Sequence, residues 1–412
     1  MLKKLGILLM VFAMLTSLMA VTAFAAPEEK VIFIKDGGTG DGSSPEKAMA
    51  IGGITEASKK YKNAPLYRAW EQLKTTGGTI VICGPYTMKE SDAQRTVGEC
   101  DIVMESWFRN PDVSITYTSV WDGVDYRTTA GAKLVFEGKT AVTFPTATVL
   151  KDLTVVAGES GDRENYIAAG FNPLKLDQGT NFVANAAGKL PIILGGHRNY
   201  NGIPAVNSDT NITVDIGNAN TVGNIYGALA FTNKSQVGNT NITVKSGKVG
   251  SIYGDLKNGN GSFGLNGAIS IDIQGGIITG EIAACNVGYD AACTGKAASI
   301  KISGGDFTNC KGIKATSKYH DDNLPNMSGP ANLVVDCSAA TQAVYTRVKA
   351  LTTLTVTAPP ADENPTEGTD PTEGKNPAEG EEPSKTGDMI GVVVAMMVVS
   401  GMGIVALKKR EG

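Results

Sequence analysis

The chain has 412 residues, of which 42% are hydrophobic, only 6% are aromatic and 50 are glycine. Its 37 Lys and Arg residues and 41 Asp and Glu residues give a formal net charge of −4. This balance argues against nucleic acid or an acidic lipid surface as a partner, since both attract basic proteins. The composition favours turns and small side chains that can stack closely.

Residues 1–25 have the pattern of a signal peptide. A short basic start precedes an apolar run, and Ala23-Phe24-Ala25 supplies the small residues that a signal peptidase recognises. We therefore expect this segment to be removed on export and the mature chain to be extracellular. An uncleaved membrane anchor fits less well, because the chain turns polar soon after these small residues.

Residues 26–78 are predicted to hold a first strand and a capping helix. Apolar residues recur at helical spacing in LYRAWEQL, which predicts a helix with one apolar face. Gly77-Gly78 ends this helix, and the next strand follows directly. The residues of the apolar face are Leu66, Ala69, Trp70 and Leu73.

Internal repetition dominates residues 79–358. TNITVDIGNANTVGNIYG starts at Thr210 and TNITVKSGKVGSIYG at Thr240, and looser units start at Gly267 and Ala297. Each unit opens with alternating apolar and polar residues, so one face of a strand is dry and the other wet. The units are aligned on Ile212, Ile242 and Ile269, at intervals of 30 and 27 residues, and Ile271 recurs as Ile300.

A strand, a turn, a second short strand and a loop that recur at this period predict a β-solenoid. No unit can bury its own apolar face, so each strand should pair in parallel with its copy in the next coil. A β-sandwich is the alternative, but it does not require a fixed period. Further strand-like segments are SITY at Ser114, KLVF at Lys133, DLTVV at Asp152, LPIIL at Leu190, NLVV at Asn332 and TLTV at Thr353.

The opening VIFIKDGGTGDGSSPEKA, followed by the helix and GGTIVICG, resembles the start of parallel β-helix proteins of the pectin-lyase-like superfamily. The repeated units resemble coils of surface proteins from gut-dwelling Firmicutes. The resemblance covers most of residues 31–357 and implies an all-β, right-handed parallel β-helix. It leaves function open, because this fold serves lyases, hydrolases, adhesins and spacers.

The outward acidic residues do not form an evident catalytic site. A lyase of this superfamily would need clustered carboxylates for Ca²⁺, and a glycosidase would need paired Asp residues on adjacent coils. In our alignment Asp215 is followed by Lys245, Asp272 and Lys301, and such alternation favours a solvated charge ladder. We therefore predict no catalytic residue, no cofactor and no metal site.

Aromatic and polar side chains are the candidates for ligand binding. Tyr226 and Tyr253 each follow the Ile of an IYG triplet, so both are expected to point outward, one coil above the other, with Ala283 in the third coil. Two stacked, exposed rings could hold a sugar face or could form a structural ladder. Three further candidates lie together in the loop GGHRNYNG: His197, Arg198 and Tyr200.

The six cysteines fit an exported protein with few disulfides. Cys285 and Cys293 flank NVGYDAA and form the candidate disulfide. Cys83 and Cys337 end apolar runs, where a thiol packs as a small hydrophobic group. The spacings match no zinc site.

Residues 359–383 are predicted to form a disordered acidic stalk. The run NPTEGTDPTEGKNPAEGEEP places proline every six residues and offers few apolar side chains to bury. The uncharged run 389–407 could cross a membrane, since a helix of that length spans roughly 28 Å. Basic residues follow it, which places the end of the chain in the cytoplasm.

The segment 383–412 resembles the cell-wall sorting signal of Gram-positive surface proteins, whose motif is Leu-Pro-any-Thr-Gly. The resemblance implies that a sortase joins the threonine carbonyl to a peptidoglycan precursor. A protein that stays in the membrane is the alternative. Thr386 and Gly387 match the motif, Lys385 fills its free position, and Pro383 and Ser384 replace its Leu and Pro.

These features predict a cell-surface protein without catalysis, adhesive or structural in role. Its expected partners are the sortase and the wall precursor at the tail, and glycans or host surface proteins at the β-helix. The alternative function is that of an extracellular polysaccharide lyase or glycoside hydrolase.

Overall fold

The computed structural model describes residues 29–92, 100–103, 109–159, 165–196, 208–230, 237–257, 267–287, 297–318, 330 and 332–361. The chain divides into two units, with the boundary after Pro360. The predicted signal peptide, the sorting residues Pro383–Gly387, the span 389–407 and nearly all of the stalk lie outside the described residues. Among the described helices, none is long and apolar enough to cross a membrane.

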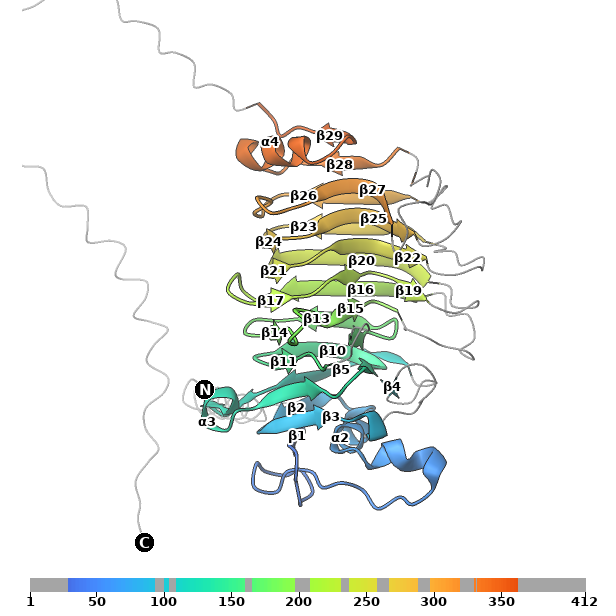
Figure 1. Cartoon of the computed structure of the whole chain (residues 1–412), viewed down its shortest axis with the longest axis vertical. Helices are drawn as coiled ribbons and strands as arrows, with labels where there is room; N and C mark the ends of the chain where they lie inside the picture. The colour runs from blue at the N-terminus through green and yellow to red at the C-terminus, as the bar shows by residue number, and fades with distance from the viewer. Residues whose placement is uncertain are drawn as a thin grey trace, which may run out of the picture. The chain divides into compact units, whose positions relative to one another are not determined.

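The described strands form a parallel β-solenoid, as the sequence predicts (Figure 1). Its largest face is an eleven-stranded sheet, and each strand pairs in parallel with the strands of neighbouring coils. In spatial order its strands are β1 (Val31–Ile34), β2 (Gly78–Ile82), β5 (Asn110–Thr118), β10 (Thr146–Lys151), β13 (Pro173–Leu176), β16 (Ser208–Asp215), β20 (Val237–Ser246), β23 (Ile269–Ile273), β26 (Ala298–Ile302), β28 (Val334–Asp336) and β29 (Thr355–Thr357).

Two further faces complete each coil. A nine-stranded sheet holds β4 (Cys100–Val103), β9 (Thr140–Thr143), β12 (Tyr166–Ala168), β15 (Ile192–Leu194), β18 (Ile225–Tyr226), β19 (Leu229–Ala230), β22 (Ile252–Lys257), β25 (Glu281–Val287) and β27 (Gly312–Lys318). The third face consists of a four-stranded and a three-stranded sheet, with β3 (Pro85–Met88), β8 (Lys133–Phe136), β11 (Thr154–Val156) and β14 (Asn181–Val183), then β17 (Thr221–Val222), β21 (Lys248–Val249) and β24 (Ile277–Ile278).

A repeat unit therefore contains three strands rather than the two that we predicted. The first unit contributes β16, β17 and β18, and the second contributes β20, β21 and β22. The strand that the sequence did not reveal has only two residues, too few for a period-2 pattern to be recognised. The IYG segments are the strands of the nine-stranded sheet, as expected for a second strand.

The interior is a column of aliphatic side chains. Ile212, Ile242, Ile271 and Ile300 occupy the same register position on successive coils, and each is at most 1% exposed. The predicted alignment of Ile269 with Ile242 was wrong by two residues, because Ile269 pairs with Thr240. A two-residue shift leaves every side chain on its original face, so the alternation did not expose the error.

The glycine of each IYG triplet lies where two strands of the solenoid approach closely. A Cβ at Gly227 would overlap the side chain of Thr240, and one at Gly254 would overlap that of Ile269. The repeat therefore requires glycine after Tyr226 and Tyr253 so that the nine-stranded sheet can lie against the next strand of the large sheet.

Both ends of the solenoid carry a helix. The predicted helix is confirmed as α2 (Pro65–Leu73), with its four apolar positions at most 1% exposed. The sequence did not reveal α4 (Gln342–Ala350), which lies at the C-terminal end beside β28 and β29 (Figure 1). Thr341 caps it by accepting a hydrogen bond from the Val344 amide. The short helix α3 (Tyr126–Thr129) follows an antiparallel pair, β6 (Val120–Trp121) and β7 (Val124–Asp125).

We expect Ile271→Asp to unfold the coils around β23, because it would place a charge without a partner in a fully buried column. The substitution should lower the free energy of unfolding by about 3–5 kcal/mol. Ser270→Asp, which adds the same charge on the outer face of the same strand, is the control and should leave the fold intact. Circular dichroism and urea unfolding measure both variants. A well-folded Ile271→Asp protein would contradict the assigned facing of β23.

Candidate functional site

The predicted tyrosine pair lies on the outer face of the nine-stranded sheet. Tyr226 pairs with Tyr253, and Tyr253 pairs with Ala283, as the sequence suggested. The rings stack with centroids 4.8 Å apart and planes inclined by 28°. The expected exposure was wrong, however, since Tyr226 is only 5% and Tyr253 only 7% exposed. Buried rings cannot receive a sugar face, so the geometry favours the structural aromatic ladder.

The two rings belong to a longer apolar strip on this outer face. Its members come from six successive strands, β9 to β25, and none is more than 7% exposed. The strip is therefore a second hydrophobic core, separate from the column inside the coils. It consists of Ala141, Tyr166, Ala168, Ile192, Leu194, Tyr226, Tyr253 and Ala283.

A polar cluster centred on Glu281 lies beside the tyrosine pair. The Glu281 carboxylate accepts a hydrogen bond from the Tyr253 hydroxyl at 2.9 Å and from the Lys314 ammonium at 2.7 Å. It also accepts one from the hydroxyl of Ser317. Tyr253 lies on β22, Glu281 itself on β25, and the other two partners on β27, so one carboxylate joins three successive coils.

The surroundings of this cluster shift the pKa values of two of its groups in opposite directions. Burial alone would raise the pKa of Glu281, but the hydrogen bonds from Lys314, Ser317 and Tyr253 outweigh it and hold that pKa below its ordinary value. Burial, with the adjacent Glu281 carboxylate, raises the pKa of Tyr253 to about 12. Both groups are thus fixed in one protonation state at neutral pH, which suits a structural contact better than proton transfer.

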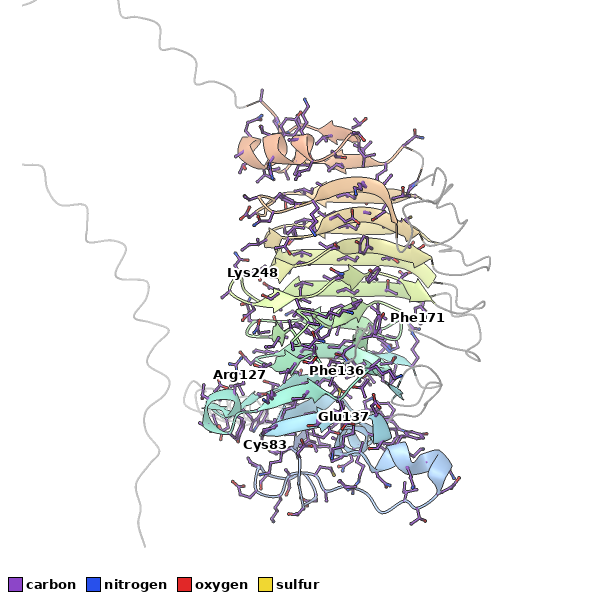
Figure 2. The ribbon with its side chains drawn as sticks, in the orientation of Figure 1. Cys83, Arg127, Phe136, Glu137, Phe171 and Lys248 are labelled. Atoms are coloured by element: carbon purple, nitrogen blue, oxygen red, sulfur yellow. The ribbon has the colours of Figure 1, made fainter. Side chains whose placement is uncertain are left out.

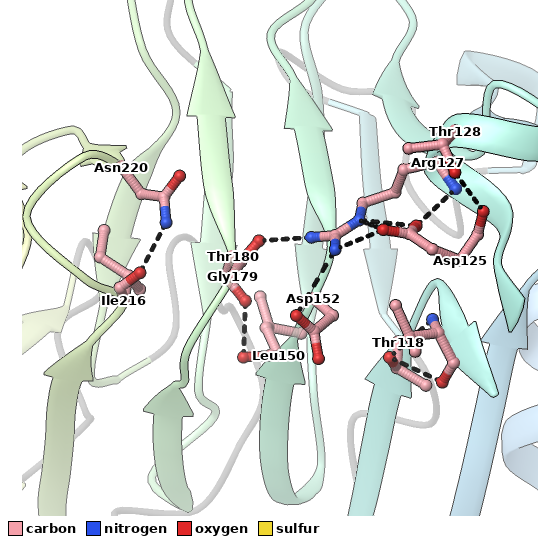
Figure 3. Close-up of polar contacts among 11 residues, drawn as sticks. Thr118, Asp125, Arg127, Thr128, Leu150, Asp152, Gly179, Thr180, Ile216 and Asn220 are labelled. Carbon is pink, nitrogen blue, oxygen red and sulfur yellow. Dashed lines mark hydrogen bonds and ion pairs between the residues drawn. The ribbon is translucent and has the colours of Figure 1, made fainter. Parts of the chain in front are cut away.

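A second polar network joins the N-terminal coils (Figure 3). The Arg127 guanidinium binds both carboxylate oxygens of Asp125, donates to the Gly179 carbonyl at 2.9 Å and lies 3.6 Å from the Asp152 carboxylate. Hydrogen bonding to Arg127 lowers the pKa of Asp125. Figure 2 places Arg127 at the side of the solenoid, where it fastens α3 and its strand pair to the two following coils.

The outward acidic residues do not occupy one register position. Asp215 pairs with Ser246, Asp272 lies between Thr243 and Lys301, and Asp306 bridges to Ile277. The expectation that they would not stack is therefore confirmed. The predicted alternation was wrong at its first two steps, because a register shift after Val214 leaves Lys245 out of line with Asp215, and Asp272 pairs with Thr243 instead of Lys245. The last step, from Asp272 to Lys301, is confirmed.

One pair of carboxylates on adjacent coils escaped the sequence analysis. Asp177 directly follows β13, and Asp215 ends β16, which is paired with β13 up to Leu176 and Val214. Asp177 and Asp215 therefore each come one residue beyond the last printed pair of these two strands. Asp177 is 3.1 Å from the Lys175 ammonium, and Asp215 accepts hydrogen bonds from Gln178 at 2.8 Å and Ser246 at 2.7 Å.

A shallow pocket lies at the N-terminal end, between the loop after β1 and the start of α2. Lys35, Asp36, Tyr86 and Lys89 contribute to its lining. The Asp36 carboxylate accepts hydrogen bonds from both the hydroxyl and the amide of Thr87. The Tyr86 hydroxyl accepts one from the Leu66 amide at the start of the helix. These contacts fasten the N-terminal cap to the first coils.

The structure confirms the packing predicted for two of the cysteines. Cys83 and Cys337 are buried free thiols, as expected, and Cys310 is a third. Burial raises the pKa of all three, to about 11 for Cys337, so none is a reactive thiolate at neutral pH. Cys285 is disulfide-bonded. Its predicted partner Cys293 lies outside the described residues.

The loop candidates His197, Arg198 and Tyr200 lie outside the described residues, so the structure does not position them. Within the described part of the chain, no three His, Cys, Asp or Glu side chains gather in a way that could hold a metal ion.

A scan against protein-family models found no match, and searches of the curated proteins and of the solved structures found none either. The fold assignment therefore depends on the strand pairings described above. The likeness to pectin-lyase-like proteins and to wall-anchored surface proteins stays a prediction.

We expect Glu281→Gln to lower the stability of the C-terminal coils by about 1–2 kcal/mol at pH 7, because it removes the charge that three neighbouring groups bind. The folded protein holds the Glu281 pKa below its ordinary value of 4.5, so this stabilisation is present above that pH and is lost as the pH falls below it. The difference between wild type and variant should therefore shrink in acid.

Urea unfolding from pH 3 to pH 7 measures that difference. Glu71→Gln is the control, since Glu71 forms an exposed ion pair with Lys74 and its loss should change little. A gap between wild type and Glu281→Gln that does not vary with pH would contradict the assignment.

Proposed function

We propose that this chain is a non-catalytic β-helix protein displayed on the cell surface, with an adhesive or structural role. The observation that supports this best is the use of its carboxylates, many of which bind groups on other coils. Glu281 binds Lys314, Asp215 binds Ser246, and Asp209 accepts a hydrogen bond from the Asn239 amide at 2.7 Å. Carboxylates held in this way stabilise the solenoid rather than act as acids or bases.

The same proposal covers the hand of the solenoid, the export of the chain and its attachment to the cell. The solenoid winds as a right-handed β-helix of the pectin-lyase-like kind, in keeping with the strong preference of parallel crossovers for that hand. A cleaved signal peptide exports the chain. The stalk 359–383 holds the solenoid away from the cell, and a sortase links Thr386 to the wall after the segment 389–407 has held the chain in the membrane.

A second candidate function is glycoside hydrolysis, and one observation favours it. Asp177 and Asp215 each come one residue beyond the last paired residues of two adjacent strands, and a pair of catalytic carboxylates would lie on adjacent coils in this way. Both are bound to neighbouring side chains, so the first proposal accounts for them without catalysis.

A panel of host, plant and bacterial-wall polysaccharides separates these functions. We expect the full-length protein, in mild detergent, to retain one or more polymers and to cleave none, with or without Ca²⁺. Retention is scored by co-sedimentation and cleavage by the release of reducing ends in the same samples. Cleavage that disappears in Asp177→Asn and Asp215→Asn would overturn the non-catalytic proposal.

Thr386→Ala tests the attachment to the wall. The substitution alters the residue whose carbonyl a sortase would attack, so the variant should stay in the membrane and dissolve in detergent. Wild-type protein should instead be released only when the wall is digested. Thr372→Ala makes the same change in the stalk, outside the sorting motif, so it serves as the control and should behave as wild type. Wild-type protein that detergent extracts completely would refute sorting.

A further inference from the structure

The N-terminal end of the solenoid is closed tightly. The outer edge of β1 is bonded, because the Phe33 amide donates to the Gly42 carbonyl and the Phe33 carbonyl accepts from the Met49 amide, both at 2.8 Å. The helix α2 covers the core at this end, and most of its residues are buried. These buried residues are Pro65, Leu66, Tyr67, Ala69, Trp70 and Leu73. Little of the first coil is therefore left open to solvent.

The C-terminal end is closed much less tightly. We call β28, α4 and β29 the C-terminal cap (Figure 1). Val348 is the one buried residue of α4, and both Thr355 and Thr357 of β29 are exposed. In the described part of the chain, no strand follows β29 in its sheet and no backbone hydrogen bond binds its outer edge. The helix and the last strand of the cap therefore gain little from burial.

Few strand pairs join this cap to the coils before it. β28 pairs with β26 at two positions, Ile300 with Val335 and Lys301 with Asp336, whereas β23 and β26 pair at five. Among the described strands, the nine-stranded sheet ends at β27 and the third face ends at β24. The cap thus continues one of the three faces, while an inner coil pairs on all three.

The helix of the cap adds a small number of polar contacts. The Arg347 guanidinium donates to the Phe307 carbonyl at 3.2 Å and to the Thr308 carbonyl at 2.8 Å. The Leu351 carbonyl accepts a hydrogen bond from the Ile313 amide of β27 at 2.9 Å. Arg347 is exposed, so water competes for its bonds. One side chain thus supplies two of the three contacts.

We propose that the C-terminal cap opens as one unit while the coils from β1 to β27 stay folded. Segments with few buried contacts and solvent-exposed hydrogen bonds open at the lowest free energy. Opening the cap breaks pairing on one face, whereas opening an inner coil breaks pairing on three. The chain continues from β29 into residues 361–412, so a pull on that part of the chain reaches the cap before the coils. This inference goes beyond the proposed function and does not depend on it.

Two buried free thiols report on the two ends of the solenoid. Cys337 directly follows β28 in the cap and is fully buried, and Cys83 follows β2 at the N-terminal end and is 3% exposed. Iodoacetamide reaches a buried thiol only when the structure around it opens. In the full-length protein, in mild detergent and without denaturant, we expect Cys337 to be alkylated at least about tenfold faster than Cys83. Mass spectrometry of tryptic peptides measures both rates in one sample.

Arg347→Ala tests whether the cap opens separately from the coils. It removes the hydrogen bonds to the Phe307 and Thr308 carbonyls, so it should speed the alkylation of Cys337 by about a further tenfold and leave Cys83 unchanged. Lys349→Ala is the matched control, because it removes the same charge from the same helix. The Lys349 ammonium lies 5.7 Å from the ring centroid of Tyr345, within α4 itself, so this variant should behave as wild type.

Three results would overturn the inference. The first is alkylation of Cys337 no faster than that of Cys83, which would mean that the solenoid opens as a whole. The second is an equal acceleration of both thiols in Arg347→Ala, and the third is a Cys337 rate that this variant leaves unchanged. None of these results depends on ligand binding, wall attachment or cleavage, so the failure of this inference is distinguishable from the failure of the proposed function.

Discussion

Parallel pairing between coils is the interaction on which the rest of this structure depends. Ile242, Ile271 and Ile300 can be buried only because the strands that carry them lie in register on neighbouring coils. Burying a side chain of this size contributes about 1.5–3 kcal/mol. A coil without neighbours would lose this contribution, so stability must accumulate along the stack.

The polar networks follow from the same pairing. Once two strands are in register, their outward side chains lie about 4.8 Å apart, close enough to hydrogen-bond directly. Glu281 and Lys314 meet although 33 residues separate them, and Arg127 reaches Gly179 across 52 residues. Each network adds a polar tie between coils that the interior column already holds together.

The same dependence explains which features the sequence could predict. Alternation identified the inner face of the strands correctly, because the side chains of a strand repeat every two residues whatever its partner. It could not fix the partner itself, so Ile269 was aligned where Ile271 belongs. It placed Tyr226 and Tyr253 on the outer face but could not show that they are buried there. α4 gave no clear signal, because Val348 is its one fully buried residue.

The side chains that stabilise the solenoid differ from those that are available to bind a ligand. The interior column and the apolar strip beside Tyr226 exclude water, so their side chains are committed to packing. The carboxylates of Glu281 and Asp215 are committed to neighbouring coils in the same way. Thr213, Thr243 and Ser270 on the outer face of the eleven-stranded sheet differ, because they lie outside both cores and their replacement leaves the alternation of the strands unchanged. A surface of this kind can vary in sequence while the coils beneath it stay the same, which is the property that a ligand-binding face on a repetitive scaffold requires.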